Sequence, residues 1–230
     1  MIDTIVVSTQ EQKDGLIEVL KKYHCDIPDI KVILAGGIEY LKYPEKPRRP
    51  YSLIAVSRLS IRKKVDWIVK SVIKAHSLNS NITLDIYGRG ECWPDLEKIV
   101  EEHGAKSYIK FMGYCDVTDV YKNYEVFITA SIWETLGLST MEAIGSGASV
   151  IGLDVPYGNR LFVKNGENGY LVDYDKDNVD EEKLINTFAE KIIEIFEDEQ
   201  RLEQFHQASY KNASRFFTQI IEEKWKNLSI

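Results

Sequence analysis

A regular alternation of strand and helix patterns from Tyr51 onward is the feature that most constrains the fold of this chain. The strand-like runs are short, apolar and rich in β-branched residues, as is typical of strands that a parallel sheet buries on both faces. The predicted strands are residues 52–57, 82–88, 109–113, 125–129, 149–153 and 169–172. The predicted helices are residues 64–78, 93–103, 116–123, 138–146 and 181–197. This order predicts an α/β fold with a doubly wound parallel sheet.

The segments that flank this alternation differ from it. A helix predicted over residues 9–23, with Thr9 as its candidate N-cap, lies between two short strand patterns at residues 4–8 and 31–37. Residues 45–50 carry two prolines and three basic residues, which is typical of a linker. We therefore expect an N-terminal unit and linker over residues 1–50, a main domain over residues 51–197, and C-terminal helices over residues 198–230.

The composition excludes several classes of partner and site. A formal net charge of −7 disfavours nucleic acid, because phosphate contacts need a basic face. No stretch approaches the length and apolarity of a membrane span. Cys25, Cys92 and Cys115 are far apart and odd in number, so they predict reduced thiols and no zinc site. We expect a cytoplasmic chain, with a peripheral position at the inner face of a membrane left open.

Seven residues separate Glu134 from Glu142, and the two carboxylates bracket a predicted strand-to-helix turn. Open α/β sheets bind ligands at the carboxyl ends of their strands, where such turns lie. Carboxylates accept bidentate hydrogen bonds from vicinal diols. Gly137 would let the backbone approach a ligand, and the following N–H groups at the helix start would face a phosphate. The pattern favours a ligand with both hydroxyls and phosphate, such as a nucleotide sugar.

The segment Ser139-x-x-Glu142 has a second interpretation as a capping box. A capping box stabilises the start of a helix by about 1 kcal/mol. It would explain Glu142 without any ligand, although it would explain neither Glu134 nor Gly137.

Arg58 and Lys63 form a second constellation, at the end of the first strand of the sheet and just before the next helix. Two cations beside the positive end of a helix dipole are costly unless an anion lies there. A pyrophosphate would take a forked contact from Arg58 and a point charge from Lys63. The alternative is a solvated basic turn.

Residues 173–180 resemble the start of a calcium loop but lack its glycine and glutamate, so helix-capping carboxylates are favoured there.

Five sequence blocks along the predicted main domain, in order and at regular spacing, resemble a known family. The blocks are SRLSIRK, YGRGE, IKFMGY, ETLGLSTMEAIGSGASVIG and NGENGYLV. Together they resemble the C-terminal domain of retaining GT-B glycosyltransferases of family 4, over about residues 50–175. Residues 152–172 are most similar to the branch of bacterial serine-rich-adhesin glycosyltransferases and poly(glycerol-phosphate) α-glucosyltransferases. The resemblance implies a Rossmann-like sheet that is one half of a GT-B fold.

The resemblance also implies a role for each matching residue. Arg58 and Lys63 would bind the donor diphosphate and stabilise the leaving phosphate, and Glu134 would contact the donor sugar. Glu142 would hold the ribose hydroxyls. The other implied donor-binding residues are Gly88, Gly90, Gly113, Tyr114, Gly137, Leu138 and Ser139. One departure stands out: Thr135 replaces the first glycine of the usual E-G-F-G-L segment.

The resemblance implies a metal-independent transferase that uses UDP-glucose or UDP-N-acetylglucosamine and no cofactor. Its acceptor would be a protein Ser/Thr or a cell-wall polymer hydroxyl. Residues 1–40 resemble the last strand and helix of the N-terminal GT-B domain, to which the helix with Trp225 would return. The chain would then be an inactive fragment whose partner is the missing domain or, through the same docking surface, a second copy. Two alternatives stay open: a non-catalytic partner subunit of a glycosyltransferase complex, and a sugar-nucleotide epimerase.

Overall fold

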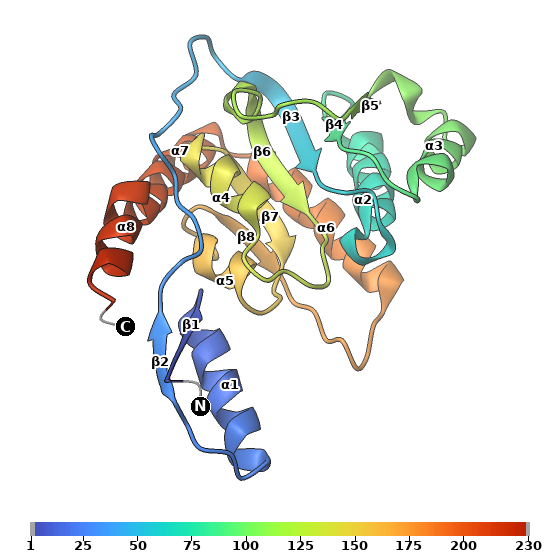
Figure 1. Ribbon diagram of the computed structural model, residues 1–230. Helices are drawn as coiled ribbons and strands as arrows, with labels where there is room; N and C mark the ends of the chain where they lie inside the picture. Colours follow the sequence, from blue (N-terminus) through green and yellow to red (C-terminus); the bar gives the residue numbers. More distant parts are fainter. Residues whose placement is uncertain (1–2, 229–230) are drawn as a thin grey trace.

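The computed structural model describes residues 3–228 and contains a six-stranded sheet with a smaller unit beside it (Figure 1). The strand order of the large sheet is β5-β4-β3-β6-β7-β8, and all five pairings are parallel. The strands are β3 (Arg49–Val56), β4 (Thr83–Tyr87), β5 (Ile109–Gly113), β6 (Tyr124–Thr129), β7 (Ser149–Leu153) and β8 (Gly169–Val172). The doubly wound parallel sheet predicted from the sequence is confirmed.

Helices cover both faces of the large sheet (Figure 1). One face packs against α2 (Val65–Leu78), α3 (Trp93–Glu102) and α6 (Glu181–Phe196). The other packs against α4 (Leu138–Gly145) and α5 (Gly158–Phe162) and, near the C-terminus, α7 (Glu199–Ala213). Neighbouring residues of β3 serve opposite faces: Leu53 belongs to the first core and Ile54 to the second, and neither has exposed surface. This two-sided burial explains the continuous apolar runs of the sequence.

The smaller unit consists of β1 (Thr4–Val7), α1 (Gln10–Lys22) and β2 (Asp29–Val32), with β1 and β2 paired in parallel. Thr9 caps α1 in a capping box with Gln12, which confirms its predicted role as N-cap. The second strand begins and ends earlier than the predicted range of residues 31–37. No residue of α1 is buried.

The last helix, α8 (Thr218–Lys226), lies against the segment that follows β2. The Trp225 indole N–H donates to the Leu34 carbonyl at 2.9 Å. Backbone hydrogen bonds link Ile38 to Phe216 and Thr218 to Ile38. By contrast α7 packs on α4 and β7 and so covers the large sheet. No helix within residues 3–228 is long and apolar enough to cross a bilayer.

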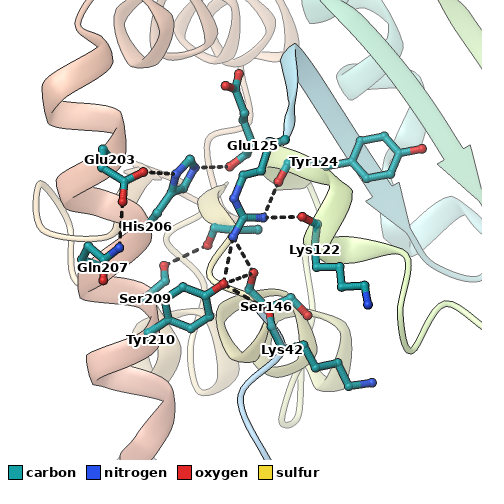
Figure 2. A network of polar contacts seen from close by, with 12 residues as sticks. Lys42, Lys122, Tyr124, Glu125, Ser146, Glu203, His206, Gln207, Ser209 and Tyr210 are labelled. Carbon is teal, nitrogen blue, oxygen red and sulfur yellow. Dashed lines mark hydrogen bonds and ion pairs between the residues drawn. The ribbon is translucent and has the colours of Figure 1, made fainter. Parts of the chain in front are cut away.

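Two local predictions are wrong. Most of the helix predicted over residues 116–123 is irregular, and only Tyr121–Asn123 forms a short 3-10 turn. The Asp116 carboxylate accepts the Thr118 backbone N–H at 2.9 Å, and such a local bond favours a turn. The predicted linker over residues 45–50 ends early, because Arg49 already begins β3. Arg48 donates to three backbone carbonyls and to the Tyr210 hydroxyl, so this segment is tied down (Figure 2).

Candidate functional site

The strand order reverses between β3 and β6, and the candidate site lies at the carboxyl ends of these two strands. The chain leaving β3 continues to β4 and β5 on one side, whereas the chain leaving β6 continues to β7 and β8 on the other. Such a switch point opens a crevice that binds ligands in α/β proteins. Here it holds a cleft of about 780 Å³, which we call the main cleft. Its lining includes Arg58, Gly88, Tyr114, Ser139 and Glu142.

Glu142 lies in the main cleft and is held by a tyrosine. The Tyr121 hydroxyl donates to Glu142 Oε2 at 3.0 Å. Desolvation by the surrounding walls raises the pKa of Glu142 above its usual value, and the Tyr121 hydrogen bond opposes that rise. Tyr121 therefore orients the Glu142 carboxylate. The residue is also exposed and lines the main cleft, so the carboxylate remains accessible to a ligand.

The capping-box interpretation of Glu142 is wrong. The N-cap of α4 is Gly137, in a left-handed conformation with φ of 76°, and no side chain caps the helix. Leu138 is the first helical residue and Ser139 the second, so their backbone N–H groups lack intrahelical acceptors. The start of α4 thus presents bare donors next to Glu142, which suits an anionic ligand.

Lys63 and Glu134 form a direct ion pair, with Lys63 Nζ 2.6 Å from Glu134 Oε1. Their side chains are 25% and 16% exposed, so the pair is partly shielded from solvent. Lys63 ends the 3-10 turn Ile61–Lys63 that follows β3, and Glu134 lies in the loop that follows β6. A backbone hydrogen bond from Ile132 N to Arg62 O, 3.0 Å long, joins these two segments. The sequence predicted each residue at a ligand site but did not predict that they pair.

Arg58 differs from Lys63 because it has no partner among the described residues. It is exposed, it lines the main cleft, and within residues 3–228 its guanidinium makes no hydrogen bond or ion pair. Two glycines after β4 allow the segment that carries Arg58 to lie close. A Cβ on Gly88 would meet the Ser57 carbonyl at 1.8 Å, and one on Gly90 would meet the Leu59 carbonyl at 2.2 Å. Gly88 lines the main cleft, whereas Gly90 does not.

The loop after β5 forms the opposite rim of the main cleft. Gly113 ends β5 with φ of 75°, and its carbonyl accepts the Gly88 N–H at 2.8 Å. The next residue, Tyr114, is 79% exposed and presents an aromatic ring at the cleft. An exposed aromatic ring at such a rim can stack on a planar base.

Sequence reasoning missed Tyr121 and Lys42. Tyr121 was assigned to a helix that does not form, and no local signal marks its bond to Glu142. Lys42 lines a second cavity of about 430 Å³, which shares Thr118 and Glu142 with the main cleft. Lys42 Nζ donates to the Thr118 carbonyl at 2.6 Å.

Within residues 3–228, no group of three or more histidine, cysteine, aspartate or glutamate residues is arranged to hold a metal ion.

Comparison with known proteins gives a family match over most of the chain. The profile of the family described as "Glycosyl transferases group 1" matches residues 42–212. The GtfA subunit of the UDP-N-acetylglucosamine--peptide N-acetylglucosaminyltransferase of Streptococcus pneumoniae is 43% identical over 98% of this chain and 44% of its own length. The corresponding subunit of Streptococcus gordonii is 40% identical over 99% of this chain and 44% of its own length. The chain therefore spans less than half the length of these curated relatives.

More distant relatives and solved structures agree with this match. The poly(glycerol-phosphate) alpha-glucosyltransferase of Bacillus subtilis is 28% identical over 78% of this chain and 26% of its own length. The crystal structure of the pneumococcal O-GlcNAc transferase GtfA in complex with UDP and GlcNAc has a TM-score of 0.93, covering 98% of this chain and 44% of that one. These likenesses confirm the predicted half of a GT-B fold and the predicted similarity to the two groups of relatives.

Proposed function

The chain belongs to the group 1 glycosyl transferases, and we propose that it forms the donor-binding half of a retaining, metal-independent transferase of family 4 that uses a UDP-sugar. The observation that carries the proposal is the position of two pairs of residues at the switch point between β3 and β6. Arg58 and Glu142 line the main cleft, and the Lys63–Glu134 ion pair joins the segments that follow the same two strands. Two cations, two carboxylates and the bare amides of α4 complement a diphosphate flanked by two sugars.

Each group in the cluster has a part in donor binding under this proposal. Arg58, which has no protein partner in the described chain, takes the diphosphate in the main cleft. Glu142, oriented by Tyr121, accepts from the ribose hydroxyls, and Tyr114 lies beside the base. Glu134 accepts from hydroxyls of the transferred sugar while Lys63 stays close to the phosphate end.

Catalysis in the complete enzyme is then mainly electrostatic. The bond from the anomeric carbon to the diphosphate breaks as the acceptor hydroxyl attacks, negative charge develops on the leaving diphosphate, and an oxygen of that diphosphate takes the proton of the hydroxyl. Arg58, Lys63 and the start of α4 stabilise that charge, because preorganised cations and amides act there without reorganisation. The second GT-B half would supply the acceptor and the opposite wall. We therefore expect these 230 residues alone to transfer no sugar.

The favoured donor is UDP-N-acetylglucosamine and the favoured acceptor a protein Ser/Thr hydroxyl. The 43% and 40% identity to GtfA subunits supports this choice over UDP-glucose and a cell-wall polymer, for which the similarity is lower. A partner subunit is supported by the crystal structure of a GtfA/B complex, whose likeness to this chain has a TM-score of 0.91. The epimerase alternative loses support because the matching family is one of transferases.

Calorimetry on the 230-residue chain tests the proposal. We expect UDP to bind in the presence of EDTA and more tightly than GDP or ADP. Glu142→Ala should weaken UDP binding about tenfold to a hundredfold, because it loses a charged hydrogen bond. Glu134→Ala should leave UDP binding nearly unchanged and weaken UDP-N-acetylglucosamine. Glu97→Ala, at an exposed glutamate of α3 that does not line the main cleft, is the control.

Three outcomes contradict this proposal in part or in whole. Binding that disappears with EDTA contradicts the metal-free site. UDP affinity that is unchanged in Glu142→Ala contradicts the assigned ribose contact. If the wild-type chain binds no nucleotide at all, the non-catalytic partner subunit becomes the better interpretation.

A further inference from the structure

The loop that carries Glu134 is supported by the turn that precedes α5. Glu134 and Tyr157 form an isolated parallel β-bridge. Gly158 comes so close to the loop that a Cβ there would meet the Leu136 carbonyl at 2.0 Å. The position of the Glu134 carboxylate therefore depends on the conformation of residues 155–158.

That turn is held in a strained conformation. Tyr157 has φ of 79° and ψ of −87°, close to the rare γ-turn geometry that side-chain-bearing residues avoid. Strained backbone of this kind persists only where the surroundings hold it in place. Among the described residues, the Tyr157 backbone N–H finds its acceptor in a distant element: it donates to Glu11 Oε2 at 3.1 Å.

Glu11 belongs to the first turn of α1, in the small N-terminal unit. Its other carboxylate oxygen, Oε1, lies 2.6 Å from Arg160 Nη1. The same guanidinium also pairs with Asp154, the residue after β7. Glu11 thus bridges the strained turn and the following helix, although it is 146 residues away from Tyr157 in sequence.

The residue next to Glu11 holds the Glu134 loop itself. Gln12 Nε2 donates to the Thr135 carbonyl at 3.1 Å, one residue beyond Glu134. The Gln12 side chain is fixed in turn, because its Oε1 accepts the backbone N–H groups of Ser8 and Thr9 in the capping box. The first turn of α1 therefore holds both the loop and the turn that supports it. Within residues 3–228, Arg58 and Glu142 make no hydrogen bond or ion pair with α1, and no residue of α1 lines the main cleft.

We propose that Glu11 is a positioning residue that holds the Tyr157 turn in its strained conformation and thereby sets Glu134 for the sugar of the donor. This inference rests on the proposed function, since it assigns the sugar contact to Glu134. It implies that recognition of the sugar depends on the N-terminal unit, whereas recognition of the nucleotide does not. The Glu11–Arg160 pair is 40% and 42% exposed, so its loss should hardly change global stability.

Hydrogen exchange and calorimetry on the 230-residue chain test the proposal with Glu11→Ala. We expect faster amide exchange at residues 132–137 and 155–158 and a nearly unchanged melting temperature. The ratio of the Kd for UDP-N-acetylglucosamine to the Kd for UDP should rise about threefold or more, in the range of coupling between contacting groups. The Kd for UDP alone should not change.

Two further variants make the test specific. Glu18→Ala removes an exposed glutamate two turns further along α1 that has no side-chain partner among residues 3–228, and it should behave as wild type. Glu11→Gln keeps an acceptor for the Tyr157 N–H but loses the charge that pairs with Arg160, so it should be intermediate.

The outcomes separate this proposal from the proposed function. Unchanged exchange at residues 132–137 in Glu11→Ala overturns the proposal. Faster exchange with an unchanged ratio of dissociation constants overturns it too, as does an equal loss for UDP and UDP-N-acetylglucosamine. If wild-type chain binds neither ligand, the proposed function and the sugar role both fail, and the exchange data still decide whether Glu11 holds the loop.

Discussion

Two arginines flank β3 and have opposite surroundings. Arg48 precedes the strand, and its Nη atoms donate to the carbonyls of Lys122, Tyr124 and Ser146 and to the Tyr210 hydroxyl, at 2.7 to 3.1 Å. Figure 2 shows how these acceptors converge from separate segments. Arg58 follows the strand, is exposed, and has no partner among the described residues.

The contrast separates a structural cation from a ligand-binding one. Burial lowers the pKa of Arg48, whereas its interaction with the Tyr210 hydroxyl and the negative charges of Glu203 and Glu125 oppose that effect. A charge can be taken out of water only where the protein replaces its hydrogen bonds. At Arg58 the protein provides no replacement, although the residue lies at the ligand-binding edge of the sheet. Its charge is available for an anion from outside.

Arg48→Ala should have the largest effect, and the effect should be on stability. The substitution leaves three carbonyls and one hydroxyl without their charged donor, so we expect the free energy of unfolding to fall by about 2–4 kcal/mol. Urea titration measures it. UDP affinity of the folded fraction should not change, because Arg48 does not line the main cleft. A loss below about 0.5 kcal/mol, the range of ordinary surface substitutions, would remove the distinction between the two arginines.

Arg58→Ala should show the opposite pattern. It removes a charged contact to the donor diphosphate, so UDP affinity should fall about tenfold to a hundredfold, while stability stays within about 0.5 kcal/mol of wild type. Arg62→Ala is a matched control, because Arg62 is exposed nearby and lies outside the main cleft. Equal losses in both variants would mean that UDP responds to the general positive charge of this segment rather than to Arg58.

The same contrast shows what the sequence could predict. The apolar runs and the residues at their ends are local features, so the strands of the large sheet, Arg58 and the Glu134–Glu142 spacing could all be recognised. Arg48 was assigned to a linker because its acceptors lie 74 to 162 residues away. The pairing of Lys63 with Glu134 could not be predicted for the same reason, because the two residues are 71 positions apart in the sequence.

Local rules also failed where two of them competed. Ser139 and Glu142 match a capping box, but Gly137 is the N-cap in a left-handed conformation and the helix begins at Leu138, which leaves Ser139 inside its first turn. Residues 116–123 carry apolar positions at helical spacing, but the Asx turn at Asp116 determines the local conformation. The strained Tyr157 turn leaves no signal of its own, because its hydrogen-bond acceptor lies in α1.

The smallest expected effect is a pH dependence of stability, and it comes from Glu125, an acidic neighbour of Arg48. The Glu125 carboxylate accepts the Tyr51 backbone N–H at 2.8 Å, and burial raises its pKa to about 7 from the usual 4.5. The native state therefore prefers the protonated form. Stability from this group is full below about pH 4.5 and is lost as the pH rises through 7. Burial lowers the pKa of the neighbouring His206, so that residue costs stability as the pH falls below 6.5.

Glu125→Gln separates the two groups, because His206 is common to both proteins. The amide can still accept the Tyr51 N–H but cannot ionise. We expect the difference in melting temperature between Glu125→Gln and wild type to grow in favour of the variant between pH 5 and pH 8. UDP affinity should be the same in both proteins at each pH, because Glu125 lies outside the main cleft. A difference in melting temperature that stays constant over this range would mean that Glu125 is ionised at pH 5 in the folded chain, and that Arg48 compensates its charge more fully than burial opposes it.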